Sequence, residues 1–144
     1  MRSLFEKLIN VHFIKLEKGE DILETIVNYC KEVNLKSGAI YGLGAVEKAS
    51  LGFYDLNSKT YLTNDYKFNA EILNCTGNIA KNKETGEYIA HIHMTIGDAE
   101  GKTFGGHLLP GNPISVTGEF TIFEIDTILE RELDDEFKLL LLSL

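Results

Sequence analysis

Apolar residues recur at helical spacing in one stretch of the chain. They form a single stripe made of Ile22, Leu23, Ile26, Val27, Cys30 and Val33. The residues before the stripe, Gly19-Glu20-Asp21, place acidic side chains where the helix dipole favours negative charge. Asn34 follows the stripe, and asparagine tolerates the left-handed conformation that ends many helices. The pattern therefore predicts one helix that packs its apolar side on the rest of the domain.

The remainder of the chain has the pattern of short strands separated by polar turns. The predicted strands cover residues 11–16, 39–46, 49–54, 60–62, 68–79, 87–96, 102–109 and 114–125. Turn signals include Asn57-Ser58-Lys59 and the polar loop 81–86. The segment 128–144 is ambiguous, since residues 137–142 fit either a last strand or the end of a helix. Many strands with one helix predict an α+β fold built on a mainly antiparallel, twisted sheet.

Length and composition indicate one ordinary folded domain. The chain has 144 residues, and no linker, internal repeat or low-complexity segment divides it, so we expect a single domain over residues 1–144. The longest purely apolar run, residues 139–142, is far shorter than the ~20 residues that cross a bilayer. Cys30 and Cys75 form no CxxC motif and lie in apolar stretches, which is typical of buried thiols in a reducing compartment. We expect a cytoplasmic protein without a membrane partner.

The charge balance disfavours nucleic acid as a partner. The formal net charge is −8, and Arg2 and Arg131 are the two arginines. Neutralising phosphates requires clustered lysine and arginine, whereas the lysines here are dispersed along the chain. A dedicated polyanion-binding surface is therefore not expected.

Two histidines share one face of a predicted strand. Side chains alternate along a strand, so His91 and His93 point the same way, while Ile92 and Met94 between and after them point to the apolar side. This alternation predicts a half-buried strand with its histidines in a cleft or on the surface.

A hairpin brings a third histidine to the same face. A three-residue loop, Ala99-Glu100-Gly101 with glycine in the left-handed position, pairs Asp98 with Lys102. Counting back along both strands places His93 opposite His107, with Cβ atoms about 5 Å apart. A two-residue loop would shift the pairing by one residue and separate the histidines.

Three imidazoles on one face match the ligand set of an open zinc site, which keeps a further position for water or substrate. The sequence therefore predicts a metal site at His91, His93 and His107. Zinc suits imidazole, and nickel, copper or iron remain alternatives. Because only neutral imidazole binds a metal, the affinity should fall as the pH drops through ~6.5. Gly105 and Gly106 are expected to leave room for a ligand beside the third histidine. The other reading is an ordinary strand whose histidines line the surface.

Other candidate residues carry weaker signals. Glu71 and Glu119 lie in predicted strands, and either is a candidate fourth ligand or general base. Asp98 and Glu100 read as solvated turn residues, and His12 as structural. Gly42-Leu43-Gly44 lacks both the third glycine and the helix of a dinucleotide-binding loop, so tight backbone packing is the preferred interpretation. No catalytic residue is assigned.

The order of several motifs resembles the plants-and-prokaryotes conserved (PPC) domain in its stand-alone prokaryotic form. The resemblance covers residues 10–142 and rests on Glu17 to Leu23, Ser37-Gly38-Ala39 with Gly42-Leu43-Gly44-Ala45, Leu51-Gly52-Phe53-Tyr54-Asp55, Glu71-Ile72-Leu73 with Gly77, His91-Ile92-His93 and Gly105-Gly106-His107-Leu108. It implies an α+β fold with one main helix, a homotrimeric assembly, and three motif histidines that resemble a zinc site.

This resemblance leaves the function open between two classes. One is a metal-binding homotrimer that binds a small molecule or assists a reaction through its metal. The alternative is a DNA-binding or transcription-associated interaction module, since members of the family are often given a DNA-binding label. The chain has no Arg-Gly-Arg-Pro hook, and its net charge of −8 weighs against that label.

Overall fold

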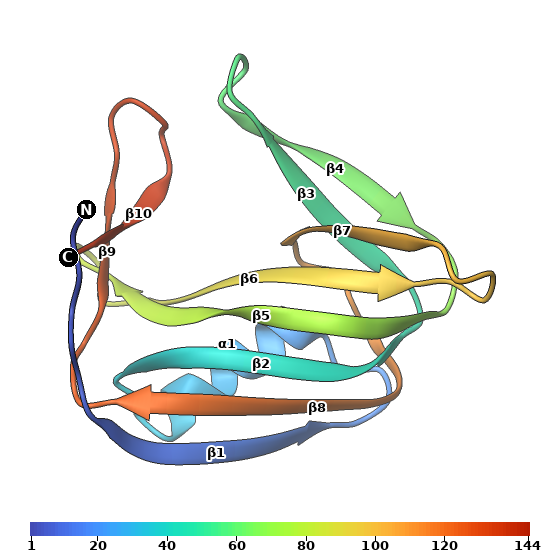
Figure 1. The fold of residues 1–144 in the computed structure, drawn as a ribbon, viewed down its shortest axis with the longest axis horizontal. Coiled ribbons are helices and arrows are strands. Elements are labelled where there is room, and N and C mark those ends of the chain that lie inside the picture. The colour runs from blue at the N-terminus through green and yellow to red at the C-terminus, as the bar shows by residue number, and fades with distance from the viewer.

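One long sheet and one helix make up the computed structural model, which describes residues 1–144 (Figure 1). The elements are β1 (Leu8–Leu16), α1 (Ile22–Glu32), β2 (Ser37–Val46), β3 (Ala49–Asp55), β4 (Thr60–Tyr66), β5 (Ala70–Asn82), β6 (Tyr88–Gly97), β7 (Thr103–Leu108), β8 (Ile114–Ile125), β9 (Glu130–Leu133) and β10 (Leu140–Ser143). The main path of the sheet runs β1-β8-β2-β5-β6-β7-β3-β4, with every pair antiparallel. The predicted α+β class with a mainly antiparallel sheet is confirmed.

Helix α1 begins where the sequence predicts. Asp21 is its N-cap, and its carboxylate accepts a hydrogen bond from the Glu24 backbone N–H at 3.1 Å. The same carboxylate accepts from the backbone N–H groups of Gly111 and Asn112, which ties the start of the helix to the β7–β8 connection. After the helix, Asn34 adopts a left-handed φ of 49°. Val33, predicted to belong to the apolar stripe, lies past the last helical turn and is exposed.

Helix α1 lies against one face of the sheet (Figure 1), and the hydrophobic core fills the space between them. The helix contributes Ile22, Ile26 and Cys30, and strand β6 contributes Ile92, Met94 and Ile96 from alternate positions. Cys75 is also buried, and burial raises the pKa of both thiols to about 12. Because β6 turns its apolar residues toward the core, its histidines must face the opposite side of the sheet.

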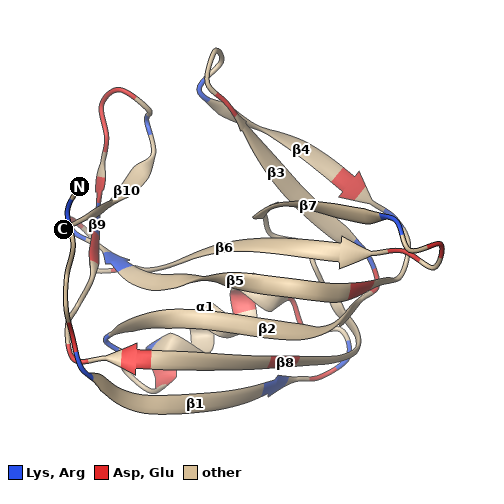
Figure 2. Cartoon of the chain, viewed as in Figure 1, with Lys and Arg blue, Asp and Glu red and all other residues tan.

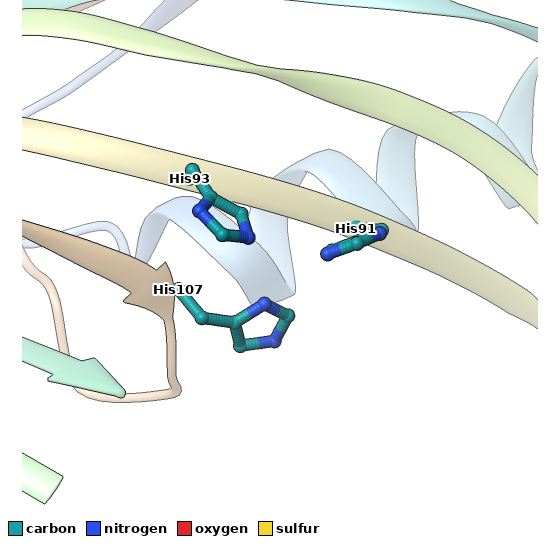
Figure 3. A group of neighbouring side chains, drawn as sticks. All are labelled: His91, His93 and His107. Carbon is teal, nitrogen blue, oxygen red and sulfur yellow. The ribbon is translucent and has the colours of Figure 1, made fainter. Parts of the chain in front are cut away.

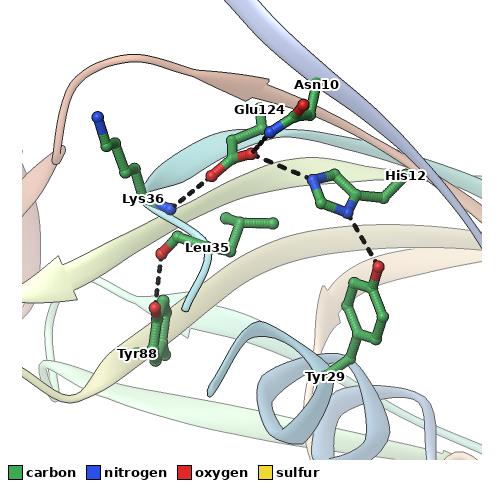
Figure 4. Close-up of polar contacts among 7 residues, drawn as sticks. All are labelled: Asn10, His12, Tyr29, Leu35, Lys36, Tyr88 and Glu124. Carbon is green, nitrogen blue, oxygen red and sulfur yellow. Dashed lines mark hydrogen bonds and ion pairs between the residues drawn. The ribbon is translucent and has the colours of Figure 1, made fainter. Parts of the chain in front are cut away.

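His12 lies outside the histidine cluster and connects the helix to the sheet (Figure 4). Its Nδ1 lies 2.9 Å from the Tyr29 hydroxyl on α1, and its Nε2 lies 3.2 Å from a Glu124 carboxylate oxygen on β8. Asn10 Nδ2 and the Lys36 backbone N–H also donate to this carboxylate, which is 5% exposed. The structure therefore agrees with the structural role predicted for His12.

Replacing Glu124 with glutamine is expected to make stability less dependent on pH. Burial alone would raise the pKa of Glu124, but hydrogen bonds from Asn10, the Lys36 N–H and His12 outweigh it and lower this pKa. The carboxylate therefore stabilises the fold above the unfolded-state value of ~4.3, and this contribution is lost as the pH falls through the lower folded pKa. Urea unfolding should show that Glu124→Gln costs about 2 kcal/mol at pH 7. The difference from the unsubstituted protein should shrink below pH ~4.3; an unchanged gap there would contradict this explanation.

The C-terminal segment forms a hairpin, which settles the ambiguity of residues 128–144. Strand β9 pairs with β10 in an antiparallel register and with β5 in a short parallel one. This pairing also extends β5 to Asn82, into the predicted loop 81–86, because the Lys81 N–H donates to the Leu129 carbonyl. The Tyr54 hydroxyl of β3 donates to the Phe137 carbonyl, so the β3–β4 and β9–β10 hairpins touch on the face away from the helix.

The glycine pair Gly42 and Gly44 has a packing role, as predicted. A Cβ at Gly42 would overlap the Phe120 ring, and Gly44 lies at a register shift with a φ of 141°. At that backbone conformation a side chain is strained, and one at Gly44 would also overlap the Thr117 carbonyl. Both glycines thus allow β2 and β8 to pack closely.

Candidate metal centre

The β6–β7 hairpin has the register predicted from its turn residues. His93 pairs with His107, Thr95 with Gly105, and the Asp98 N–H donates to the Lys102 carbonyl at 3.0 Å. Gly101 has a φ of 79°, as the three-residue loop requires. The local sequence therefore brings two of the three histidines face to face across neighbouring strands.

All three histidines converge on the face of the sheet opposite α1 (Figure 3). The ring centroids lie 5.3 Å apart for His91 and His93, 5.1 Å for His91 and His107, and 5.4 Å for His93 and His107. One nitrogen of each ring lies within 4.8 Å of the others. Ligand nitrogens at ~2.05 Å from a tetrahedral zinc ion are about 3.4 Å apart, so ring rotations of modest size would close the set around a metal.

His107 has a ring nitrogen that the protein leaves without a partner. Its Nδ1 is buried and makes no hydrogen bond, and Figure 3 shows a nitrogen of this ring turned toward His91 and His93. The ring stacks on Tyr61 of β4, with centroids 4.7 Å apart and an interplanar angle of 26°. A buried unpaired polar atom costs roughly 1–3 kcal/mol, and a metal ion would satisfy this one. The donor set therefore fits a divalent metal that accepts imidazole nitrogen.

Arg131 holds the His91 ring through a hydrogen bond to its Nδ1. It comes from β9, is 4% exposed, and places Nη2 3.0 Å from His91 Nδ1. Nη2 also donates to Asn78 Oδ1 on β5, and Nη1 donates to the Leu140 carbonyl. These contacts fix the His91 ring. Because Nδ1 accepts from Arg131, the neutral ring carries its proton on Nε2, and a metal ion would replace this proton or the Arg131 contact.

The surroundings keep two of the imidazoles neutral. Burial, then the charges of Arg131 and His93, lowers the pKa of His91. Burial, with smaller contributions from His91, His93 and Arg131, lowers the pKa of His107 to about 4. Both rings are thus uncharged at neutral pH, the protonation state that metal binding requires. The sequence predicts that the metal is lost as the pH falls through ~6.5. Because His91 and His107 are protonated only at a lower pH, their bonds to the metal should persist below that value.

A cavity of about 190 Å³ opens beside the histidines. It lies between the β3–β4 and β9–β10 hairpins and is lined by Tyr61, Ile89, Ala90, His91, His107, Arg131, Leu139, Leu140 and Leu141. A larger cavity of about 620 Å³, bordered by Glu47, Glu71 and Asp98, has no histidine in its wall. The smaller cavity is therefore the one that a ligand of the metal could occupy.

The structure does not bring the candidate carboxylates to the histidines. Glu71 and Glu119 are exposed and do not belong to the histidine cluster. Asp98 accepts backbone hydrogen bonds within its turn, and Glu100 pairs with Lys102 on the surface, as predicted. A fourth protein ligand or an acidic general base next to the cluster is thus not provided by these four residues.

The predicted space beside Gly105 and Gly106 is occupied by protein. A Cβ on Gly106 would lie 2.8 Å from the Gly52 carbonyl oxygen, and one on Gly105 would lie 3.3 Å from the Met94 carbonyl oxygen. These glycines let β7 pack between β6 and β3, so the expectation that they make room for a ligand is wrong. Sequence reasoning also missed Tyr61 and Arg131. Arg131 stood out only as one of two arginines in the chain, and the sequence pattern did not single out Tyr61.

Comparison with known families identifies the fold. The profile of the Plants and Prokaryotes Conserved (PCC) domain matches residues 5–126. The chain belongs to this family. The PCC domain, abbreviated PPC above, thus includes all three histidines, and the family resemblance predicted from the motifs is confirmed.

Solved structures of the PPC domain cover nearly the whole chain. A PPC protein from Pyrococcus horikoshii has a TM-score of 0.89 at 26% identity, covering 100% of this chain and 99% of its own. A metal-containing protein from Archaeoglobus fulgidus has a TM-score of 0.88 at 25% identity, covering 99% of each chain. A candidate DNA-binding protein from Bacteroides thetaiotaomicron has a TM-score of 0.87 at 26% identity, covering 96% of this chain and 94% of its own.

The curated relatives that match this PPC domain are much longer proteins. Over 115 residues the chain is 27% identical to a bifunctional protein GlmU from Synechococcus, a match that covers 79% of this chain and 17% of that protein. The chain therefore spans about a sixth of the relative's length. In this PPC domain, no helix is long and apolar enough to cross a membrane.

Proposed function

We propose that this PPC protein binds one divalent metal ion, with zinc as the favoured ion, through His91, His93 and His107. The observation that carries the proposal is the convergence of three imidazoles whose ligand atoms lie within 4.8 Å of one another, with His107 Nδ1 buried and unpartnered. The metal-containing structural neighbour from Archaeoglobus fulgidus, 25% identical, supports it.

The bound metal would serve small-molecule binding or a metal-assisted reaction. In such a site a divalent metal polarises a carbonyl group or activates water. The chain's own contribution is to hold the histidines and to offer a cavity of about 190 Å³ beside His91 and His107, bordered by Leu139, Leu140 and Leu141. No carboxylate joins the three-histidine cluster, so a proton-transferring residue is not assigned.

Metal analysis of protein purified without a histidine tag tests the proposal. We expect close to one equivalent of metal per chain, and zinc as the main element when several first-row metals are supplied together. A preparation that holds less than a tenth of an equivalent after incubation with each metal would refute it.

We also propose that the protein assembles as a homotrimer through the face of the sheet opposite α1. This face carries exposed apolar side chains, among them Val11, Phe13, Tyr41, Leu43 and Phe123, of which Phe13 is 84% exposed. The cross-strand row Phe13–Thr121–Tyr41–Thr76–His93–His107 shows that these side chains share a face with the histidines. A second copy covering this face would therefore lie next to the metal centre.

Replacing Phe13 with aspartate is expected to break this assembly. A buried, unpaired carboxylate in an apolar interface costs several kcal/mol, whereas on an exposed strand of a monomer it costs little. Light scattering should give three times the chain mass of 16.1 kDa for the unsubstituted protein and a single chain for Phe13→Asp. Lys31→Asp, a charge change at an exposed side chain of α1 on the other side of the sheet, is the control and should remain trimeric. A monomeric unsubstituted protein would contradict the proposed trimer.

DNA binding is the alternative, favoured by the structural neighbour from Bacteroides thetaiotaomicron described as a candidate DNA-binding protein. Figure 2 marks the basic residues in blue, and they lie scattered near the ends of strands, interspersed with acidic residues in red. Five lysines and their acidic partners form exposed ion pairs, which further reduces free positive charge. Salt-sensitive retention of DNA by the metal-free protein would favour this alternative over the metal-centred role.

A further inference from the structure

Arg131 is a buried cation that lacks a counter-ion within the chain. Its side chain is 4% exposed, and none of the six ion pairs includes it. Its three hydrogen-bond acceptors, the Leu140 carbonyl, Asn78 Oδ1 and His91 Nδ1, are uncharged groups, and its Nε has no partner. The guanidinium therefore keeps its full charge in a place from which water is largely excluded.

An uncompensated buried charge is costly. Moving an ion out of water costs several kcal/mol even after the protein relaxes, and neutral hydrogen-bond acceptors recover only part of this. Arginine does not avoid the cost by losing its proton, because its pKa is too high. An anion next to Arg131 would remove the imbalance and would find a planar donor group that suits carboxylate oxygens.

The cavity in contact with Arg131 limits which anion fits. Six of its nine lining residues are hydrophobic, three of them the consecutive leucines Leu139, Leu140 and Leu141. Its volume of about 190 Å³ lies below the ~300–1,000 Å³ of sites that bind drug-sized molecules. A fully polar anion such as phosphate would lose hydration against the leucines, whereas a short apolar chain would gain by contact with them.

We propose that this cavity binds a small organic carboxylate, with its carboxyl group at Arg131, its short apolar part on Leu139, Leu140 and Leu141, and the metal centre of His91 and His107 within reach. The contact with the metal centre rests on the proposed function. A dication held by three neutral imidazoles would add two positive charges that also attract the carboxylate, since no carboxylate of the chain joins the cluster. The contact with Arg131 does not depend on the metal.

Calorimetric titration with butyrate and with butyramide tests the proposal. The two probes are nearly equal in size and differ in charge, and inorganic phosphate serves as the purely polar anion. Each is titrated into metal-free and zinc-loaded protein. We expect butyrate to bind both forms, and butyramide and phosphate to bind at least tenfold more weakly. Arg131→Gln should weaken butyrate at least tenfold, and Arg2→Gln, which changes the other arginine, should leave it unchanged.

Arg131 also holds β10, so Arg131→Lys is the second variant. Lysine keeps the charge and loses the planar fork, and its affinity for butyrate should fall between those of the unsubstituted protein and Arg131→Gln. Equal binding of butyrate and butyramide, tighter binding of phosphate, or butyrate binding that is the same in both Arg131 variants would overturn the proposal. So would the absence of butyrate binding, as expected if a neighbouring copy supplied a carboxylate to Arg131. Butyrate binding that depends on Arg131 in a protein without affinity for metal would refute the metal site alone.

Discussion

Replacing His107 with alanine is expected to abolish metal binding while the fold survives. His107 supplies one of three ligands, and its loss should lower the affinity for zinc by more than the 10–100-fold that follows from losing an outer partner of a ligand. The metal-free protein should be little affected, because the variant removes a buried Nδ1 that has no hydrogen-bond partner. The stacking contact with Tyr61 is lost at the same time. We expect these two effects to leave the free energy of unfolding within about 1 kcal/mol.

The measurement compares unfolding with and without metal. Zinc at 100 times its dissociation constant should stabilise the unsubstituted protein by about 2.7 kcal/mol and His107→Ala by nothing measurable. His12→Gln changes a histidine outside the cluster and should keep its response to zinc. If His107→Ala still bound one equivalent of zinc, the three-histidine assignment would be wrong.

Replacing Gly77 with alanine is expected to lower the free energy of unfolding more than any other substitution proposed for this protein. Gly77 on β5 pairs with Ile92 on β6, between the two histidines of that strand. A Cβ at this position would overlap the His91 carbonyl oxygen and lie 2.7 Å from Ile92 Cα. Both are backbone atoms of a central strand, which a side-chain rotation cannot relieve. We expect a loss of about 3 kcal/mol in the free energy of unfolding.

The same substitution should also weaken metal binding, since any shift of β6 moves His91 relative to His107. Urea unfolding gives the first effect and zinc titration the second. Gly97→Ala is the matched control on β6, because its Cβ would meet only the end of the Leu73 side chain, at 3.1 Å, and Leu73 is exposed. A Gly77→Ala protein as stable as Gly97→Ala would contradict the close approach of β5 and β6 described above.

The parts of the site that the sequence predicts correctly depend on local geometry. Strand alternation places His91 and His93 together, and the three-residue turn at Gly101 fixes His107 opposite His93. Both follow from residues less than twenty positions apart. The helix is equally local, with its cap at Asp21 and its left-handed end at Asn34.

The parts that it does not predict depend on contacts between distant segments. Arg131 reaches His91 because two residues of β9 pair with β5 in parallel, a register that no turn between them determines. Tyr61 reaches His107 through the pairing of β7 with β3 and of β3 with β4. Gly106 faces the β3 backbone for the same reason, which is why the space expected there is filled.

The family match ends at residue 126, four residues before β9 begins. The three histidines thus lie inside the matched region, while Arg131 and the cavity leucines Leu139, Leu140 and Leu141 lie beyond it. Substitutions in residues 130–143 would therefore reshape the cavity and its charge without replacing an atom that could hold the metal. Metal retention and ligand preference can diverge independently in such a chain, so two proteins that share the histidines need not share a ligand.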